Sequence, residues 1–362
     1  MIGEIEKAEK EINVGANEIN DRAGQWRAIL VVVIFVLAGV GFLFSEIFRI
    51  VNVDADRGVK EIVSNLANWP QSAVQKTEAG KKVEIPHQTA PKLPRLVGSM
   101  PDPARFGAAA VMIRDVSTGA VLFGKNQYES RPLASVSKLM TALVALDMGP
   151  NWTATTSVVS AEVSDKHLDS GGVYTLHEFW QASLVPSSNR AVLSLVQGLG
   201  IDQTDFVARM NAKARELGMM STSFEEPTGL SENNLSTASD VVQLLSEALR
   251  HDEIRETLLM KSVTLGDGEN AKKLISTDLI LLGWIPTDFK FLGGKTGFTN
   301  AAGYNFTMRV ENKAGRVVDV VVLGAMAHED RFTEAKDAAE WAFRNYVWPD
   351  DPGYSSTTLN SR

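Results

Sequence analysis

The sequence predicts an α+β fold, in which an antiparallel sheet with flanking helices follows a single N-terminal transmembrane helix. A long uncharged apolar run near the N-terminus indicates the transmembrane helix. Strand-like runs joined by turns that contain Gly indicate the sheet, and apolar residues at helical spacing between those runs indicate the helices. The 362 residues, 44% of them hydrophobic, suit one domain of about 250 residues and an extension.

Composition and charge exclude several classes of function. The formal net charge is −8 and no cluster of Lys and Arg stands out, so the electrostatic footprint of a nucleic-acid-binding protein is missing. Cysteine is absent, which excludes disulfides and thiolate sites. The five histidines are scattered without the spacing of metal ligands, and we expect neither a metal nor a cofactor. They are His87, His167, His177, His251 and His328.

The apolar run near the N-terminus predicts a membrane anchor over residues 28–48. Residues 28–44 (AILVVVIFVLAGVGFLF) carry no charge, and apolar residues continue to Phe48. At about 1.5 Å per residue, this helix covers most of a hydrocarbon core of about 30 Å. A cleaved signal peptide is the alternative, but residues 1–27 are largely polar and no clear cleavage site follows the run.

Residues 49–104 read as a connector between the anchor and a folded domain. Apolar residues from Val59 to Leu66 recur at i, i+3, i+4 and i+7, which predicts a short amphipathic helix over residues 54–69 beside the membrane. Between Pro86 and Pro103 five prolines interrupt any periodicity, which is typical of an extended stalk.

Residues 105–348 carry the pattern of the folded domain, and residues 349–362 form a C-terminal tail. Two strand-like runs, 108–115 and 120–126, are joined by a turn at Gly119, which predicts a hairpin. After Pro132, apolar residues at helical spacing predict a largely buried helix that ends near Gly149. The last predicted elements are strands at Tyr304–Val310 and Val317–Leu323 and a helix from Thr333 to about Tyr346.

The first motif is Ser135-Val136-Ser137-Lys138, at the start of the predicted buried helix. Residues three apart in a helix lie on one face, so the Lys138 amine can reach the Ser135 hydroxyl. A free lysine titrates near 10.4, so Lys138 can act as a base at neutral pH only if burial or a second cation lowers its pKa. Ser135 and Lys138 are therefore a candidate nucleophile and base.

The second motif is Ser187-Ser188-Asn189, although Ser231-Glu232-Asn233 has the same spacing. A capping box at Thr175-Leu176-His177-Glu178 opens an apolar helix that Pro186 ends, which places Ser187 and Asn189 on a turn between helices. Ser231 lies in a loop rich in Gly, Pro and Asn and reads as a turn residue. Helix capping is the alternative role for the Ser187 motif.

The third motif is Lys295-Thr296-Gly297, in a strand that contains further glycines. Glycine within a strand often marks the close approach of a ligand or another backbone, so Lys295 could pair with a carboxylate there. The segment also looks like the end of a phosphate-binding loop. That alternative fails because Phe289 stands where the loop needs Gly.

These motifs, in this order, resemble the serine D-alanyl-D-alanine carboxypeptidases, which belong to the low-molecular-mass penicillin-binding proteins. The resemblance covers roughly residues 107–347 and extends to the stretches RPLASVSKLMTALVALD, FVARMNAKARELGMMSTSFEEPTGLSENNLSTASDV and FLGGKTGFTNAAGYNF. It implies a β-lactamase/transpeptidase-like domain with an all-helical lobe. It also implies peptidoglycan stem peptides as substrate and β-lactams as inhibitors.

The resemblance gives each motif a role. Ser135 would attack the carbonyl of a terminal D-Ala-D-Ala with Lys138 as base, while Ser187 and Asn189 would relay protons and orient the stem peptide. The cationic strand would bind the terminal carboxylate through Lys295 and Thr296. The backbone N–H groups of Ser135 and of Phe298, which follows Gly297, would form the oxyanion hole.

The suspected substrate also implies an orientation in the membrane. Lysines and arginines are nearly balanced on the two sides of the apolar run, so charge alone does not fix the topology. Because peptidoglycan lies outside the cell, we expect residues 1–27 in the cytoplasm. The catalytic domain would then be extracytoplasmic, in a single-pass protein of the cell membrane.

The resemblance leaves alternatives open. The same residues would serve a DD-endopeptidase that cleaves peptidoglycan cross-links, or the scaffold could be a non-catalytic cell-wall-binding protein. A β-lactamase is less favoured because no acidic residue identifies itself as the extra base for fast deacylation. The chain also departs from the family at Arg190, where an acidic residue is common, and at Ser276-Thr277-Asp278, where Asn-Thr-Asn is more usual.

Overall fold

The structure, a computed structural model, describes residues 92–352 and 354, except residues 161, 162, 164, 166, 269 and 270. The predicted cytoplasmic segment, the anchor over 28–48 and the amphipathic helix over 54–69 lie outside the described residues. Within the described part, no helix is both long enough and apolar enough to cross a membrane.

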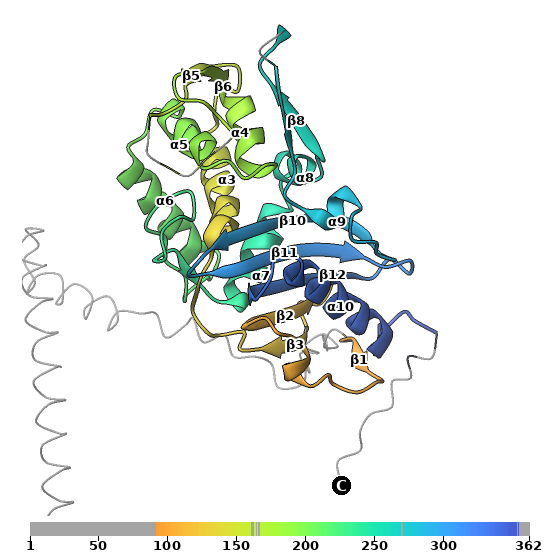
Figure 1. Cartoon of the computed structure of the whole chain (residues 1–362). Helices are drawn as coiled ribbons and strands as arrows, with labels where there is room; N and C mark the ends of the chain where they lie inside the picture. Colours follow the sequence, from red (N-terminus) through yellow and green to blue (C-terminus); the bar gives the residue numbers. More distant parts are fainter. Residues whose placement is uncertain are drawn as a thin grey trace, which may run out of the picture. The chain divides into compact units, whose positions relative to one another are not determined.

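An antiparallel sheet of five strands forms the centre of the domain, in the order β10, β11, β12, β2, β3 (Figure 1). The predicted hairpin is present as β2 and β3, and the two strands predicted near the C-terminus are β11 and β12. The strands span Lys290–Thr299 (β10), Gly303–Glu311 (β11), Val317–Ala325 (β12), Ala110–Asp115 (β2) and Val121–Lys125 (β3).

Helices cover both faces of this sheet. Because side chains alternate between faces along a strand, Ala110 and Met112 belong to one hydrophobic cluster, whereas Val111 and Ile113 belong to the other. The first cluster contains residues of α7 (Ala238–Ala248) and the second contains residues of α10 (Asp330–Asn345). The central strands are therefore apolar on both sides.

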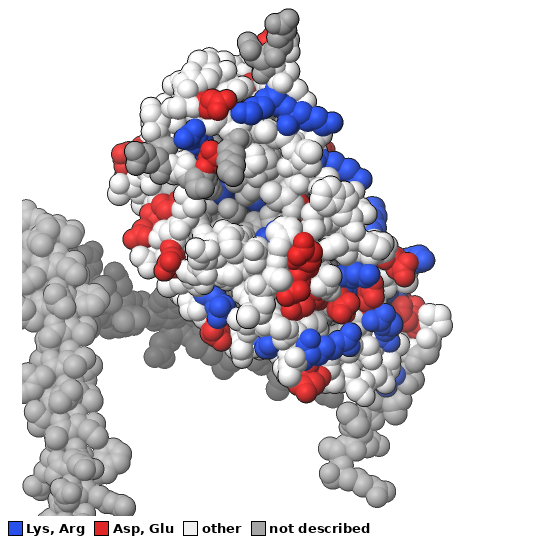
Figure 2. Space-filling model, viewed as in Figure 1, with Lys and Arg blue, Asp and Glu red and all other residues white. Residues whose placement is uncertain are grey.

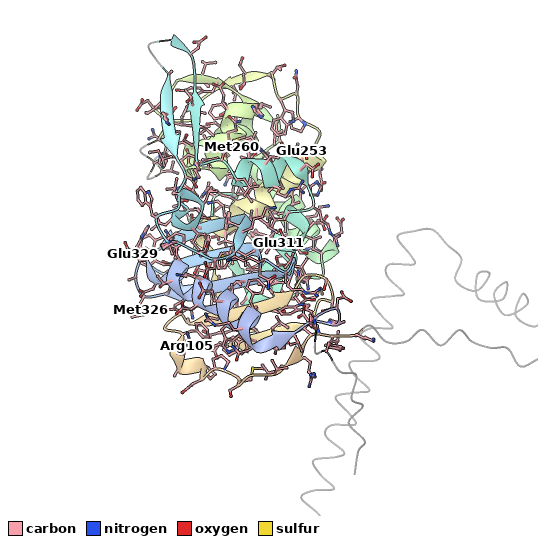
Figure 3. All side chains as sticks on the ribbon, turned by 90° about the vertical axis from the view of Figure 1, so that its right-hand side faces the viewer. Arg105, Glu253, Met260, Glu311, Met326 and Glu329 are labelled. Carbon is pink, nitrogen blue, oxygen red and sulfur yellow. The ribbon has the colours of Figure 1, made fainter. Side chains whose placement is uncertain are left out.

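A helical lobe packs beside the sheet and continues the first hydrophobic cluster, as Figures 1 and 3 show from two sides. Its centre is α3, whose flanking helices bury Phe179, Trp180 and Phe206. The sequence predicted an all-helical lobe, but this lobe also contains a short strand pair, β5 (Thr155–Ser157) and β6 (Val173–Thr175). Its helices are α3 (Lys138–Asp147), α4 (Leu176–Leu184), α5 (Asn189–Gly198), α6 (Gln203–Glu216) and α8 (Asp252–Leu258).

Short elements connect the lobe to the sheet. A 3-10 turn, η3 (Ala134–Ser137), precedes α3, and the short helix α9 (Leu279–Leu282) precedes β10. The remaining described elements are η2 (Pro103–Arg105) and the strand pairs β4 (Arg131–Pro132) with β7 (Leu235–Ser236), β5 (Thr155–Ser157) with β6 (Val173–Thr175), and β8 (Ser262–Leu265) with β9 (Lys272–Ile275).

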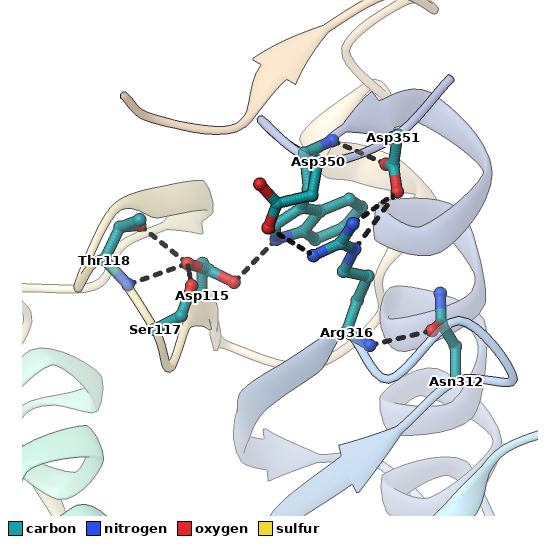
Figure 4. Close-up of polar contacts among 8 residues, drawn as sticks. Asp115, Ser117, Thr118, Asn312, Arg316, Asp350 and Asp351 are labelled. Carbon is teal, nitrogen blue, oxygen red and sulfur yellow. Dashed lines mark hydrogen bonds and ion pairs between the residues drawn. The ribbon is translucent and has the colours of Figure 1, made fainter. Parts of the chain in front are cut away.

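Residues from both ends of the described chain join the domain. Strand β1 (Arg95–Leu96), in the segment expected to be a stalk, pairs with β13 (Tyr346–Val347). Two contacts fix residues near the C-terminus. Trp348 donates its indole N–H to Asp115 at 2.7 Å. Arg316 pairs with Asp351 at 2.7 Å, as Figure 4 shows. The domain thus uses residues on both sides of the range 105–348.

Candidate active site

The three motifs meet where the helical lobe lies against β10, the edge strand of the sheet. Lys138 of α3 contacts Asn189 of α5, and Lys295 of β10 contacts Ser187 in the turn between α4 and α5. Figure 2 shows a hollow in this face of the molecule, between the lobe and the sheet, with Lys or Arg atoms at its floor. The polar side chains of the motifs therefore form one site.

Ser135 and Lys138 have the geometry of a nucleophile and its base. Lys138 Nζ donates hydrogen bonds to Ser135 Oγ at 2.7 Å, to Asn189 Oδ1 at 2.7 Å and to the Thr228 carbonyl at 2.6 Å. These acceptors use all three protons of the ammonium. When Lys138 is neutral, two donors are enough for Asn189 and Thr228, which leaves the lone pair for the Ser135 proton.

Burial gives Lys138 the proton affinity that a base needs at neutral pH. Its side chain is completely buried, and the loss of hydration lowers its pKa from 10.5 to about 7, against the opposing attraction of Glu226 and Asp165. Ser135 is only half-buried, so its hydroxyl remains accessible from the hollow. A base of this pKa loses its proton under physiological conditions.

The backbone is strained at two points of the site. Of the three non-glycine residues with positive φ in the described part of the chain, Ala134 (φ 48°) precedes the nucleophile and Ser187 (φ 66°) belongs to the second motif. Such conformations cost free energy and persist where the surroundings enforce them. Here they aim the Ser135 and Ser187 side chains at the two lysines.

The second motif differs in one respect from its prediction. The capping box of α4 is present, with Thr175 and Glu178 each bonding to the backbone of the other, and Ser187 lies on the turn after α4 as predicted. Asn189, however, is the first residue of α5, not a turn residue. The reason is that the Ser188 side chain caps α5 by accepting from Ala191 N, so the helix begins one residue after the cap.

Asp165, which is not part of the second motif, holds this motif in place. Its carboxylate accepts hydrogen bonds from Ser188 Oγ at 2.6 Å and from the backbone N–H of Arg190 at 2.7 Å. The guanidinium of Arg190 donates to the Leu168 carbonyl at 2.8 Å. Arg190 thus connects the start of α5 to the segment that carries Asp165. The family commonly has an acidic residue at position 190, and here the Asp165 carboxylate lies beside this position instead.

A loop between α6 and β7 supplies the carbonyl that Lys138 binds. The Glu226 carboxylate accepts from the backbone N–H groups of Thr228 at 2.6 Å and Gly229 at 2.5 Å, which sets the shape of the loop. Gly229 has φ +89°, and a Cβ built there would lie 1.9 Å from the Ala134 carbonyl oxygen. Only glycine fits, because the loop passes directly against the backbone beside the nucleophile.

Strand β10 brings a second buried lysine into the site. Lys295 Nζ donates to Ser187 Oγ at 2.8 Å. Burial, followed by the nearby charges of Lys138 and Arg331, holds the pKa of Lys295 well below 10.5, while Asp278 opposes this shift. A bound carboxylate would oppose this shift and favour the charged form of Lys295.

The rest of the third motif borders the nucleophile. Thr296 shares a hydrogen bond of 2.6 Å with Thr277, hydroxyl to hydroxyl. A Cβ at Gly297 would lie 2.8 Å from the Leu133 carbonyl oxygen and 3.1 Å from Ser135 N, so only glycine lets β10 approach the nucleophile this closely. Phe298 follows, and its ring stacks on Tyr304 outside the lysine cluster.

The other sequence candidates lie outside this site. Ser231 and Asn233, the competing match to the second motif, bond to Glu225 within the loop before β7, as a turn would. Among the described residues, no three His, Asp or Glu side chains come close enough together to hold a metal ion.

Comparison with known proteins identifies the family. The D-alanyl-D-alanine carboxypeptidase family matches residues 98–327, a span that contains all three motifs. The chain belongs to this family. It is a family of serine peptidases, and the pairing of Ser135 with Lys138 agrees with that chemistry.

Relatives within the family carry two different names. A D-alanyl-D-alanine endopeptidase of Pseudomonas aeruginosa is 31% identical over 256 residues, which cover 67% of this chain and 79% of the relative. The D-alanyl-D-alanine carboxypeptidase DacF of Bacillus subtilis is 30% identical over 253 residues, which cover 67% of this chain and 64% of that protein.

Solved structures of the family show the same fold. Penicillin-binding protein D2 from Listeria monocytogenes, in its cefotaxime-bound form, superposes with a TM-score of 0.58 at 32% identity, over 66% of this chain and 98% of that one. The described domain therefore has the β-lactamase/transpeptidase-like fold of penicillin-binding proteins, as the sequence predicted.

Four further residues of this candidate site lie outside the sequence motifs. Thr228 acts through its carbonyl and Thr277 through its bond to Thr296. Arg331 of α10 is buried and donates to the Gly297 carbonyl at 3.1 Å. Asp278 caps α9 through Oδ1, while its buried Oδ2 has no hydrogen-bond partner among the described residues. Only Thr277 and Asp278 had drawn notice, as part of a departure from the family pattern.

Proposed function

We propose that this protein is a serine D-Ala-D-Ala carboxypeptidase that removes the terminal D-Ala from peptidoglycan stem peptides. The single observation that carries the proposal is the contact of 2.7 Å between Ser135 Oγ and a buried Lys138 whose pKa is about 7. This pair supplies a hydroxyl nucleophile and a base that is deprotonated at neutral pH.

Acylation follows from this geometry. Ser135 Oγ attacks the carbonyl carbon of the penultimate D-Ala, and its proton moves to Lys138 Nζ. The backbone N–H groups of Ser135 and Phe298 stabilise the oxyanion, a contribution of roughly 3 to 4 kcal/mol for one donor in other serine enzymes. The C–N bond then breaks, and the leaving D-Ala amine takes the proton that Lys138 Nζ accepted from Ser135, relayed through the Ser187 hydroxyl.

Deacylation uses the same groups in reverse. Water attacks the ester on Ser135 and gives a proton to Lys138, which passes it to Ser135 Oγ as the C–O bond breaks and the shortened stem peptide leaves with a new carboxylate. Asn189, held by Lys138 at 2.7 Å, is placed to orient the stem peptide during both steps. Microscopic reversibility gives Lys138 the role of base in one direction and of acid in the other.

Buried cations explain why the substrate must end in a carboxylate. Lys295 donates to Ser187 and Arg331 donates to the Gly297 carbonyl, and among the described residues Asp278 is the carboxylate that raises the pKa of both. The terminal carboxylate of D-Ala-D-Ala would bind Lys295 and the Thr296 hydroxyl. Burial strengthens this attraction because little water screens it.

β-Lactams should acylate Ser135. Penicillin-binding protein D2, at 32% identity, has a structure with cefotaxime bound. We also propose that residues 28–48 anchor the protein in the cell membrane with the catalytic domain outside, because peptidoglycan is found there. The uncharged run AILVVVIFVLAGVGFLF supports this part of the proposal.

Cleavage of cross-links is a second candidate function, which the endopeptidase of Pseudomonas aeruginosa at 31% identity favours. In a cross-link whose leaving residue keeps a free carboxylate next to the scissile amide, Lys295 and Thr296 would bind that carboxylate equally well. The chemistry on Ser135 is the same for both substrates, and only the size of the leaving residue differs.

Release of D-Ala from a D-Ala-D-Ala pentapeptide tests the proposal. The full chain in detergent should release D-Ala, and Ser135→Ala should abolish the release while Ser231→Ala keeps it. A cross-linked dimer as second substrate separates carboxypeptidase from endopeptidase. A wild-type protein that cleaves neither substrate would exclude both functions.

A further inference from the structure

Strand alternation sorts the residues of β10 onto two sides of the sheet. Thr296 pairs with Phe306 and Phe298 pairs with Tyr304, and side chains directly opposite each other in an antiparallel sheet share a face. Phe306 belongs to the cluster under α10, so Thr296 and Phe298 project to that face. Lys295 projects to the other face, where it bonds to Ser187 of the helical lobe.

Beyond Thr296, this face carries an exposed apolar surface. Phe298 is 46% exposed, and its ring stacks on Tyr304 with 4.2 Å between centroids and 23° between planes. We call Phe298 and Tyr304 the aromatic ledge.

Contacts with Arg331, which is buried, and with the partly exposed His328 hold the ledge in place. The guanidinium of Arg331 lies 5.4 Å from the centre of the Tyr304 ring and donates to the Gly297 carbonyl at 3.1 Å. His328 meets the same ring edge-on at 5.8 Å. Because Tyr304 is fixed by these contacts, the Phe298 ring has a rigid surface to stack on, and a ligand that covers it loses little conformational entropy of the protein.

The position of the ledge relates it to one part of the substrate. Thr296 would bind the carboxylate of the leaving residue, and Phe298 follows two residues later on the same face, roughly 7 Å along the strand. The carboxylate and the side chain of the leaving residue are attached to the same carbon atom. A side chain longer than a methyl group can therefore extend from the carboxylate site onto the ledge.

We propose that the aromatic ledge binds the side chain of the leaving residue and so selects for the diamino acid of a peptidoglycan cross-link over D-Ala. The side chain of such a residue begins with methylene groups and continues into the second stem peptide. Those methylenes would cover the face of Phe298, whereas the methyl group of D-Ala is too short to reach it. This inference rests on the proposed acyl-enzyme chemistry at Ser135.

The physical basis of the selection is burial of apolar surface. Each methylene that a pocket distinguishes changes kcat/KM by about tenfold or more when it is fully enclosed. On an open ledge the effect is smaller for each methylene, but several methylenes contribute. We therefore expect contacts between the ledge and the leaving residue to raise the ratio of kcat/KM for a cross-linked dimer to kcat/KM for a D-Ala-D-Ala pentapeptide by about tenfold.

The test compares kcat/KM for a cross-linked dimer with kcat/KM for a D-Ala-D-Ala pentapeptide, using the full chain in detergent. Phe298→Ala should lower the ratio of dimer to pentapeptide by about tenfold. Phe298→Tyr keeps the stacking ring and should keep the ratio within about twofold. Val173→Ala, which removes an apolar side chain that is 64% exposed on β6 of the helical lobe, is the matched control and should leave both rates unchanged.

An unchanged ratio in Phe298→Ala, or an equal loss with both substrates, would overturn the proposal. Labelling of Ser135 with fluorescent penicillin reports separately on the catalytic site. If Phe298→Ala does not label, Phe298→Leu replaces it and should lower the ratio by about threefold, with an unchanged ratio counting against the ledge. Failure of the wild type both to label and to cleave would overturn the proposed function and the ledge together.

Discussion

Lys138 Nζ lies 2.7 Å from Ser135 Oγ, and the lysine is completely buried while the serine is half-exposed. This relationship separates two requirements of the proposed chemistry. The nucleophile must meet the substrate, whereas the base must be kept from water so that its pKa falls to about 7. Three residues of chain, wound as a 3-10 turn into α3, satisfy both.

The pH dependence of acylation should follow the two buried lysines. Below pH 7 Lys138 holds its proton and cannot accept one from Ser135, so the second-order rate of penicillin acylation should rise about tenfold for each pH unit up to about 7. The rate should fall again as the pH passes the lowered pKa of Lys295, because this lysine then loses the charge that binds the carboxylate. Stopped-flow labelling with fluorescent penicillin, from about pH 5 to about pH 10, measures this profile. A rate independent of pH below 7 would contradict the role of Lys138.

Gly229→Ala should disrupt the site. Its Cβ would meet the Ala134 carbonyl oxygen at 1.9 Å, and the backbone there has φ +89°. We expect a loss of about 3 kcal/mol or more in the free energy of unfolding, together with loss of penicillin labelling, because the Thr228 carbonyl leaves Lys138.

Gly119→Ala is the control for the Gly229 substitution. Gly119 has a similar φ of +75°, but no described atom lies within 4 Å of its Cβ position, so only backbone strain of about 1 kcal/mol is expected. Urea unfolding and labelling should be measured on both variants. Equal destabilisation by the two substitutions would show that strain, not contact with Ala134, requires glycine at position 229.

Ser187→Ala should slow turnover of the pentapeptide by about 100-fold, because Lys295 loses its hydroxyl partner at 2.8 Å and the proton relay loses a member. Ser231→Ala alters the competing Ser-x-Asn match, in a loop where Ser231 bonds only to neighbouring loop residues among those described. Its kcat/KM should change by less than about twofold. Similar losses in both variants would contradict the assignment of the second motif.

Asp278→Asn should stabilise the protein at neutral pH. Burial raises the pKa of Asp278 from 3.8 to about 6, so the folded state binds this proton more tightly than the unfolded state. The contribution of Asp278 to stability is therefore full below pH 3.8 and is lost as the pH rises through about 6. At about 1.4 kcal/mol for each pH unit in that range, the loss at neutral pH is about 3 kcal/mol.

Asparagine keeps the cap of α9 and removes the titrating charge. The free energy of unfolding of the Asp278→Asn protein should therefore not fall between pH 4 and pH 6, the range in which the wild type loses stability because the pKa of Asp278 is about 6. Thermal unfolding of both proteins at pH 4 and at pH 7.5 measures the difference, which should be large only at the higher pH. A variant that is less stable than wild type at pH 7.5 would mean that the charge of Asp278 is needed by Lys295 and Arg331.

Local patterns in the sequence predicted the elements that position the site. The capping box at Thr175 and Glu178 predicted the start of α4, and the spacing of Ser135 and Lys138 predicted that their side chains are in contact. These predictions succeeded because hydrogen bonds to the backbone and contacts within one helical turn depend on residues close in the sequence. The predictions for residues 28–48 and 54–69 lie outside the described residues and stay predictions.

Contacts between distant segments were not predictable in the same way. The Thr228 carbonyl that binds Lys138 belongs to the backbone, which is the same at every residue, and only the fold selects it. Arg331 lies among charged residues at the start of α10, a pattern typical of an exposed face, yet the fold buries it under β10. Strand β1 has only two residues and lies in a proline-rich segment. Two residues are too few to show the alternation of apolar and polar residues by which a strand is predicted.

The most direct test of the account is the mass of the protein after reaction with penicillin, followed by peptide mapping of the adduct. The account predicts one covalent penicillin for each chain, attached to the peptide that contains Ser135, at a rate that falls as the pH drops below about 7, the pKa of Lys138. An unmodified chain, or an adduct on the peptide that contains Ser187, would contradict it.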